Sequence, residues 1–231
     1  MAKATLAKKP HEVAEMFNRV AAKYDITNDV LALGFTHSWR KATNSILNPK
    51  YGELILDLAA GTGTSSKAFT KSGAKIISCD FSIGMLKEGK KRYPNLNFSA
   101  GDALSLPFQD ETFNAVTISF GIRNVNDVQK ALTEMLRVTK KGGRIVICEF
   151  STPTIKVFKN IYMEYLMKAL PAIAKKTSSN PDAYEYLADS IRAWPNQEEF
   201  SSQLKKANWD NVEWKNLTGG IVAIHKAEKS K

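Results

Sequence analysis

From residue 54 onward the chain alternates between short apolar runs and segments with helical spacing. Five of the runs are apolar throughout, which is typical of strands covered by helices on both faces. They span residues 54–59, 75–79, 96–99, 114–120 and 144–150. Strands that alternate with helices predict an α/β fold with a parallel, doubly wound sheet.

The clearest helix of this region spans residues 127–138, where Val128, Leu132 and Met135 share one face. The sequence Lys140-Lys141-Gly142-Gly143 follows it directly. We expect the lysines to complement the helix dipole and the glycines to form the turn that ends the helix.

Further elements precede and follow this alternating region. The spacing of Val13, Met16, Phe17 and Val20 predicts an amphipathic helix, and a second helix is expected over residues 38–47. An insertion of about fifty residues after residue 150 is too long for an ordinary connection. It predicts one helix that Pro171 kinks or ends near Leu170 and another over residues 180–194. Two last runs, 211–217 and 220–225, have so short a connection that they predict an antiparallel hairpin.

Composition and charge exclude several classes of protein. The 231 residues contain 33 Lys and Arg against 23 Asp and Glu, a formal charge of +10, and mean hydropathy is −0.28. No apolar run approaches the ~18 residues of a spanning helix, and the N-terminal segment lacks the apolar centre of a secretion signal. Cys79 and Cys148 lie far apart in apolar runs, as expected of buried thiols in a reducing cytoplasm. No metal site is expected.

The loop after the first predicted strand carries the strongest chemical signal. Asp57 is followed by Gly61, Thr62 and Gly63, and glycines let a backbone approach a ligand at the carboxyl edge of a parallel sheet. Asp80 ends the second strand 19 residues after Gly61, a spacing at which a carboxylate can accept hydrogen bonds from ribose hydroxyls. Taken alone, Gly-x-Gly also fits a tight turn.

The surroundings of this loop distinguish between nucleoside ligands. A pyrophosphate dinucleotide would need a third glycine and an open helix N-terminus, whereas this loop continues Thr64-Ser65-Ser66 and has acidic residues around it. A positively charged ligand without phosphate fits better, and S-adenosylmethionine, with its sulfonium and ammonium groups, is such a ligand. Asp102, Ala103 and Ser119 end later strands at the same edge, where Asp102 could read an adenine amino group. Otherwise Asp102 forms a turn and Ser119 is an ordinary strand residue.

Several blocks of sequence then resemble a known class. The blocks are residues 59–63, 101–103 with 106–108, and 137–138 with 142–144. They look like those of class I S-adenosylmethionine-dependent methyltransferases. Narrower blocks are residues 17–21, 24–25, 28–29, 117–125, 186–192 and 216–223. These resemble the C-methyltransferases of menaquinone and ubiquinone biosynthesis, and the resemblance covers residues from about 11 to 226.

The resemblance implies a Rossmann-like, seven-stranded, mostly parallel sheet and cofactor contacts at Thr62, Asp80, Asp102, Ala103 and Ser119. It implies S-adenosylmethionine-dependent methylation of a reduced, prenylated demethylmenaquinone, a demethylmenaquinol. The alternatives are methylation of a benzoquinol of the ubiquinone pathway or of another small molecule, and residues 178–184 and 193–195 favour the menaquinone branch. We expect one domain over residues 1–231: an N-terminal cap (1–50), a cofactor-binding core (51–150), a helical insertion or lid (151–195), and a C-terminal helix and hairpin (196–231).

Arg123 and Asn124 are the first candidates for catalysis. A guanidinium at the strand edge could stabilise a phenolate or orient a water that acts as base, and Asn124 would position it. The alternative makes Arg123 a salt-bridge residue. Tyr24 and Asp25 are expected to close the site from the N-terminal helices, or else to be a core aromatic and a helix cap. His37 and His225 are possible bases by residue type, although lone histidines are more often structural.

The basic excess has three possible meanings: nucleic acid, an anionic membrane or solubility alone. Residues 155–176 hold five lysines against Glu164 alone, a local 5 − 1 = +4, beside an apolar helical stripe. We therefore expect transient contact with an anionic membrane surface from a cytoplasmic protein, with solvated lysines as the alternative. A homodimer is also possible. The Ser119-Phe120-Gly121-Ile122 block differs from the motifs of amino-methylating nucleic-acid enzymes, so no nucleic-acid partner is expected.

Overall fold

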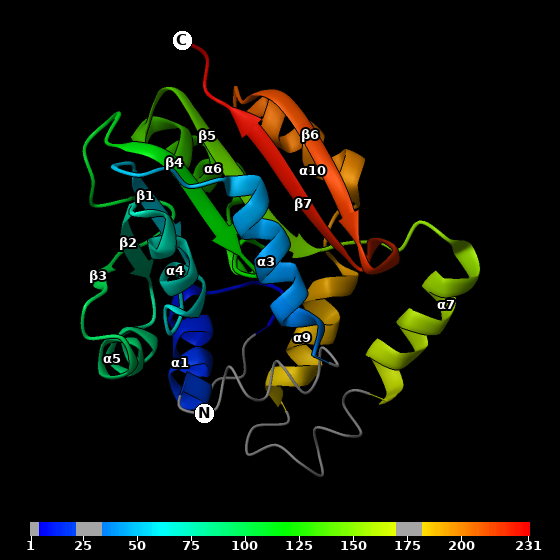
Figure 1. The fold of residues 1–231 in the computed structure, drawn as a ribbon. Helices are drawn as coiled ribbons and strands as arrows, with labels where there is room; N and C mark the ends of the chain where they lie inside the picture. Colours follow the sequence, from blue (N-terminus) through cyan, green and yellow to red (C-terminus); the bar gives the residue numbers. More distant parts are fainter. Residues whose placement is uncertain (1–4, 22–33, 170–181) are drawn as a thin grey trace.

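The computed structural model describes residues 5–21, 34–169 and 182–231, and its centre is one seven-stranded sheet (Figure 1). The strand order is β3-β2-β1-β4-β5-β7-β6. The strands are β1 (Leu54–Leu58), β2 (Lys75–Asp80), β3 (Asn97–Ala100), β4 (Phe113–Ser119), β5 (Thr139–Phe150), β6 (Asp210–Leu217) and β7 (Val222–Glu228). Strands β1 to β5 pair in parallel, whereas β7 pairs antiparallel with both β5 and β6. The predicted sheet and its terminal hairpin are confirmed.

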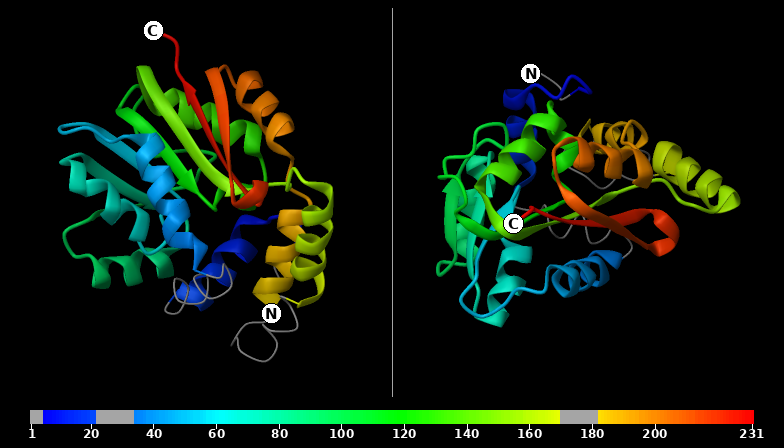
Figure 2. Two further views of the ribbon diagram at one scale, coloured as in Figure 1. Left: turned by 45° about the vertical axis from the view of Figure 1, so that its right-hand side comes forward. Right: turned by 90° about the horizontal axis from the view of Figure 1, so that it is seen from above.

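Helices cover both faces of this sheet, as its apolar strands require (Figure 2). The longer helices are α1 (Pro10–Val20), α3 (Phe35–Leu47), α4 (Thr64–Phe69), α5 (Ile83–Arg92), α6 (Val128–Val138), α7 (Lys156–Glu164), α9 (Asp182–Arg192) and α10 (Gln197–Lys206). Short helical turns are η2 (Thr70–Ser72), η3 (Ile122–Asn124), η4 (Tyr165–Ala169) and η5 (Thr218–Gly220). The helix predicted over residues 180–194 is described only from Asp182.

Two apolar cores follow from the alternation of side chains along each strand. Helices α6 and α10 pack on one face, with Leu56 and Ile147 among the buried strand residues. Helices α3 and α4 pack on the other, with Ile55 and Val146. Alternate residues of the central strands pack into opposite cores, so these strands are largely apolar in the middle. Polar residues are therefore found mainly where these strands end.

The expectation for Lys140 to Gly143 is wrong. Helix α6 ends at Val138, but the following residues continue as strand β5 instead of turning. Phe113 pairs with Thr139, and the register then shifts so that Ala115 pairs with Arg144. Gly142, with φ of 71°, donates from its N–H to the carbonyl of Lys229 at 2.9 Å. The two glycines therefore accommodate an irregularity inside the strand.

The remaining helices gather at the carboxyl edge of the parallel strands, where α1, α7 and α9 lie below the sheet (Figures 1 and 2). Helix α1 is tied there by Asn18, whose Oδ1 accepts hydrogen bonds from Ser82 Oγ at 2.7 Å and from the Gly84 N–H at 2.8 Å. Tyr162 and Leu166 pack against Ala188 and Ile191 of α9. Within the part of the chain that the structure describes, no helix is long and apolar enough to cross a membrane.

Candidate active site

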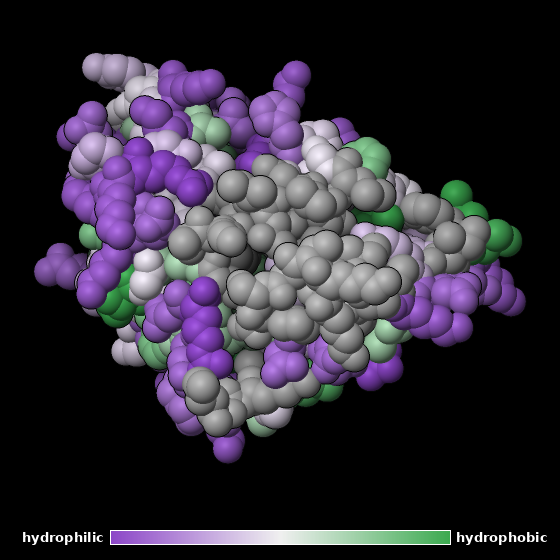
Figure 3. All heavy atoms as spheres, turned by 90° about the horizontal axis from the view of Figure 1, so that it is seen from below, coloured by the Kyte–Doolittle hydropathy of each residue, from purple (hydrophilic) through white to green (hydrophobic). Residues whose placement is uncertain are grey.

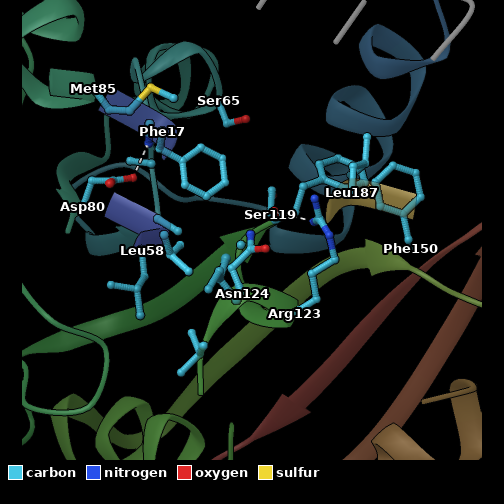
Figure 4. Close-up of a pocket in the computed structure, with 18 of the residues that line it drawn as sticks. Phe17, Leu58, Ser65, Asp80, Met85, Ser119, Arg123, Asn124, Phe150 and Leu187 are labelled. Atoms are coloured by element: carbon cyan, nitrogen blue, oxygen red, sulfur yellow. Dashed lines mark hydrogen bonds between the residues drawn. The ribbon is translucent and has the colours of Figure 1, made fainter. Parts of the chain in front are cut away.

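A cavity of about 660 Å³ opens at this carboxyl edge, within the range of small-molecule sites. Its walls come from the ends of β1, β2, β4 and β5 and from helices α1, α3, α7 and α9. Figure 4 shows two ends to the site, with Asp80 and Met85 at one and Arg123 and Phe150 at the other. The cavity therefore has a polar end and an aromatic end that are continuous with each other.

The β1–α4 loop forms the floor of the polar end. Gly61 has φ of 56° and lines the cavity, and a Cβ built on it would meet nothing within 4 Å. Its backbone is therefore open to a ligand. Gly63 faces away, since a Cβ there would lie 2.9 Å from Phe98 Cζ. The first predicted glycine lines the site, and the second lets the loop pack against β3.

Asp80 holds this loop in place. Its carboxylate accepts hydrogen bonds from the Gly61 N–H at 2.8 Å and from the Ser82 N–H at 2.7 Å. Burial raises the pKa of Asp80, and the Ser82 and Gly61 amides oppose that rise. Each carboxylate oxygen has a further lone pair, so Asp80 can still accept hydrogen bonds from a ligand in the cavity.

Asp57 lies beneath the same loop, 1% exposed, and accepts a hydrogen bond from Ser66 Oγ at 2.5 Å. Burial raises the pKa of Asp57 to about 7, the Ser66 hydroxyl opposes the rise, and the Asp80 charge adds to it. A nearby cation would reverse this shift by favouring the ionised form. Two buried carboxylates and an open glycine fit a positively charged ligand such as S-adenosylmethionine.

The other predicted cofactor residues also line the cavity: Thr62, Asp102, Ala103 and Ser119. Asp102 in addition forms the turn considered as its alternative role, because its Oδ1 accepts a hydrogen bond from the Leu104 N–H at 2.9 Å. Ser119 ends β4 midway between the two ends of the site (Figure 4). It lies where the cofactor and a second substrate would meet.

Arg123 lies on η3 and lines the aromatic end, but its guanidinium is already engaged. Nη1 donates to Glu149 Oε1 at 2.8 Å and to the Phe120 carbonyl at 2.6 Å. The Arg123 and Glu149 side chains are only 5% and 2% exposed. Arg123 is thus the salt-bridge residue considered as its alternative role, and it also lines the cavity, while its catalytic role stays a prediction.

Two polar atoms of η3 are buried without a hydrogen-bond partner among the described residues. They are Arg123 Nε and Asn124 Oδ1, and both residues line the cavity. Buried polar groups are nearly always paired in native proteins, so unpaired ones beside a cavity indicate a ligand or ordered water. Asn124 is therefore well placed to contact what binds here.

The aromatic end is built by four rings and the aliphatic side chains of α9. Trp39 lies 5.7 Å from Phe120 and 6.1 Å from Phe150 between ring centroids. Arg123 stacks on Phe150 at 5.2 Å. Tyr162 completes the group, and burial raises its pKa, which keeps the hydroxyl protonated. This end suits a flat, apolar ring that carries a few oxygens.

The other residues considered for catalysis are not among the described residues that line the cavity. Tyr24 and Asp25 lie outside the described residues. His37 is exposed on α3 and does not line the cavity. His225 is buried away from the site, with Nε2 3.0 Å from the Gln197 carbonyl, and burial lowers its pKa. Neither histidine is placed to act as a base in this cavity.

Sequence reasoning missed Glu149, Lys8 and the Phe17–Asn18 pair as site residues. Glu149 stands in an apolar run of β5 and is revealed only by its contact with Arg123 of η3. Lys8 and Phe17 line the cavity because α1 folds back over it. A buried acid in a predicted central strand is the one signal that could have identified Glu149, because an unpaired carboxylate would be costly there.

Known proteins resemble this chain over its full length. The model of the ubiE/COQ5 methyltransferase family matches residues 4–229. The demethylmenaquinone methyltransferase of Streptomyces griseus is 56% identical over 230 residues, which cover 100% of both chains. That of Corynebacterium kroppenstedtii is 58% identical over 229 residues, which cover 99% of each chain.

A solved structure shows the same fold at low identity. It is Haemonchus contortus phosphoethanolamine N-methyltransferase 2 in complex with S-adenosyl-L-methionine. It matches with a TM-score of 0.62 and 16% identity, covering 83% of this chain and 52% of that chain. The sheet, the acid-lined loop and the match over residues 4–229 lead to one assignment. The chain belongs to the ubiE/COQ5 methyltransferase family.

Proposed function

We propose that the protein transfers a methyl group from S-adenosylmethionine to a ring carbon of a demethylmenaquinol. The observation that carries this proposal is a continuous cavity that joins the acid-lined end at Asp57 and Asp80 to the aromatic end at Arg123 and Phe150. The names of the Streptomyces and Corynebacterium relatives support this acceptor. A benzoquinol would fit the same aromatic end and is the second candidate.

The polar end would hold the cofactor. Asp80 would accept hydrogen bonds from the ribose hydroxyls, and the Gly61 backbone would lie beside the bound molecule. Asp57 would provide negative charge beneath it. When bound, S-adenosylmethionine supplies a methyl group on a positively charged sulfur, which keeps the electron pair of the broken bond.

The aromatic end would hold the acceptor ring in line with that methyl group. The ring carbon forms the new bond and loses its own proton, so the balanced reaction releases one proton. Loss of the proton on the neighbouring hydroxyl makes the carbon electron-rich. Holding the reactants in line accounts for about 7–11 kcal/mol of barrier lowering in favourable cases, and a positioned base contributes about 10²–10⁴ in rate.

The direct experiment offers purified protein a demethylmenaquinol and the matching benzoquinol, each with methyl-labelled S-adenosylmethionine. We expect label on the ring carbon of the naphthoquinol, identified by mass spectrometry of the oxidised product. Label on the benzoquinol alone would favour the second candidate. A protein that binds S-adenosylmethionine in calorimetry but labels neither quinol would overturn the proposal.

We also infer that the protein meets its lipid-tailed acceptor at the inner face of an anionic membrane. Large apolar side chains are exposed at or near the starts of α3, α5 and α7: Phe35 (44%), Phe81 (44%), Ile83 (48%), Ile155 (62%) and Val157 (70%). Phe35 and Phe81 also line the cavity. Figure 3 shows hydrophobic residues beside hydrophilic ones at the α7 end of this face. Lys156 and Lys159 are exposed on α7, as an anionic surface would favour.

A further inference from the structure

Lys8 reaches the cavity from the segment that precedes α1. Its backbone N–H donates to the Thr5 carbonyl at 2.9 Å, and its φ is 50°. The ammonium donates to the Val125 carbonyl at 3.4 Å and lies 5.8 Å from the centroid of the Trp194 ring. Lys8 is half-buried and lines the cavity, whereas Lys9 is exposed and forms an ion pair with Glu12 at 3.7 Å.

The charges around Lys8 are those of the acceptor end. Burial lowers the pKa of Lys8, the Arg123 charge lowers it further, and the Glu149 charge raises it. The charges of the same Arg123–Glu149 pair also act on the buried Tyr162 and Tyr186. The titratable groups on the surrounding elements are Lys9 and Glu12 beside Lys8, Arg123 on η3, Glu149 on β5, Tyr162 on α7 and Tyr186 on α9.

The net charge of the titratable side chains around the acceptor end depends on Lys8. Arg123 and Glu149 are in contact at 2.8 Å, so they present nearly no net charge to a molecule in the cavity. Among the described residues, Lys8 has no carboxylate within ion-pair distance. Within the described part of the chain, the Lys8 ammonium is thus a positive charge at the acceptor end that no carboxylate pairs with.

We propose that Lys8 is a site residue whose ammonium stabilises the negative charge on the acceptor oxygen during methyl transfer. This inference rests on the proposed function. The hydroxyl proton leaves to water, and the oxygen is negative until its electron density enters the new carbon–carbon bond. A fixed cation favours that state most strongly beside apolar walls such as those of this cavity, where the effective dielectric constant is lower than in water.

The first test compares pH–rate profiles of the parent protein, Lys8→Met, Lys8→Arg and the control Lys9→Met. Lys8→Met should lower turnover at least tenfold at pH 7, with the loss shrinking as pH rises because the acceptor then ionises without help. Lys8→Arg should restore turnover and remove any decline at high pH that deprotonation of Lys8 causes, since guanidinium stays charged. Lys9→Met should match the parent.

The second test does not depend on methyl transfer. The absorbance of bound 1-naphthol reports the fraction present as naphtholate, and it is titrated with each variant in the presence of S-adenosylhomocysteine. Lys8→Met should move the ionisation of bound naphthol to higher pH, while Lys9→Met leaves it unchanged. If the parent methylates neither quinol, the proposed function fails, but this titration still decides the role of Lys8.

Two results would overturn the inference. One is a Lys8→Met protein with the parent's naphthol titration. The other is a loss of turnover that is equal at every pH and is accompanied by a lower melting temperature, which is the signature of a structural lysine. Calorimetry of S-adenosylmethionine binding should give the same affinity for all four proteins.

Discussion

The Arg123 guanidinium and the Glu149 carboxylate are both almost completely removed from water. Removing one partner of such a pair leaves an uncompensated buried charge, which typically costs 3–5 kcal/mol, whereas replacing both by uncharged groups costs far less. Any single substitution at Arg123 therefore mixes a catalytic effect with a folding effect. The two effects separate only when both residues are changed.

We expect Arg123→Ala to lower both turnover, at least tenfold, and the free energy of unfolding, by about 3–5 kcal/mol. The double variant Arg123→Met with Glu149→Gln should regain most of the stability, because no charge is left unpaired, and should remain at least tenfold slower. Urea unfolding measures the first quantity and methyl transfer the second. Full turnover in the stable double variant would remove Arg123 from the mechanism.

The Asp57 carboxyl should couple cofactor binding to pH. Its pKa of about 7 in the free protein falls when a cation binds beside it, so binding near pH 7 should release a proton and strengthen as pH rises through 7. Calorimetry in phosphate and in Tris measures the released proton. Asp57→Asn should abolish the release and weaken binding at least tenfold, while exposed Asp110→Asn should change neither.

The Asp57 carboxyl also makes the stability of the free protein depend on pH. Its pKa when folded lies above the ordinary value of 3.8, so the folded state keeps a proton that the unfolded state has lost between those pH values. The Asp57 contribution to the free energy of unfolding therefore falls as pH rises from about 4 to 7. A cationic ligand that binds only the folded state restores stability in this range.

At the scale of elements, α1 depends on one amide side chain for its position. Asn18 Oδ1 accepts two hydrogen bonds from the start of α5, and Phe17 beside it lines the cavity. The approach is close, since a Cβ on Gly84 would lie 2.7 Å from Asn18 Oδ1. Helix α1 also packs through Met16 against Tyr186 of α9, so it connects the two ends of the cavity.

We expect Asn18→Ala to release α1 from the cofactor end. Two hydrogen bonds at about 1 kcal/mol each correspond to a rise in the S-adenosylmethionine dissociation constant of roughly five- to thirtyfold. Arg19→Ala is the matched control, because the partner of Arg19 among the described residues is Glu15 of its own helix. Equal affinities of the two variants would show that α1 does not control cofactor binding.

An element could be predicted from the sequence when the residues that determine its conformation lie within the element itself. Strands β1 to β5 were predictable from their own apolar residues, and Asp57, Gly61 and Asp80 from their place at strand ends. The Gly142-Gly143 segment was predicted wrongly because its conformation is set by partners at Thr139 and Lys229, the second of them far along the chain. Glu149 and Lys8 were missed for the same reason, since their roles arise only from contacts across the fold.

At the scale of the whole molecule, exposed lysines and exposed apolar side chains occur together around the start of α7, where Lys156 and Lys159 lie beside Ile155 and Val157. Ile155, just before α7, and Val157 within it are 62% and 70% exposed, whereas Tyr51, at 89%, precedes β1 at the opposite edge of the sheet. A membrane that serves the cavity would bury the first two side chains and leave Tyr51 in water.

We expect Ile155→Ser with Val157→Ser to weaken binding to anionic vesicles at least tenfold, because burying each aliphatic side chain contributes about 1.5–3 kcal/mol. Binding of the parent should also weaken as salt screens the lysines. Tyr51→Ser should bind like the parent. Vesicle sedimentation at two salt concentrations measures all three proteins, and no parent binding at low salt would defeat the membrane proposal.

The position of β7 has a consequence for how the molecule is assembled. Although β6 is made first, it lies outside β7 and has no contact of its own with β5 in the strand order. It can therefore join the sheet only through β7, either after β7 has paired with β5 or together with β7 as a hairpin, and β5 lies some seventy residues before β7 in the chain. Until then the apolar edge of β5 stays exposed, so a ribosome-bound or interrupted chain offers a pairing edge to other chains.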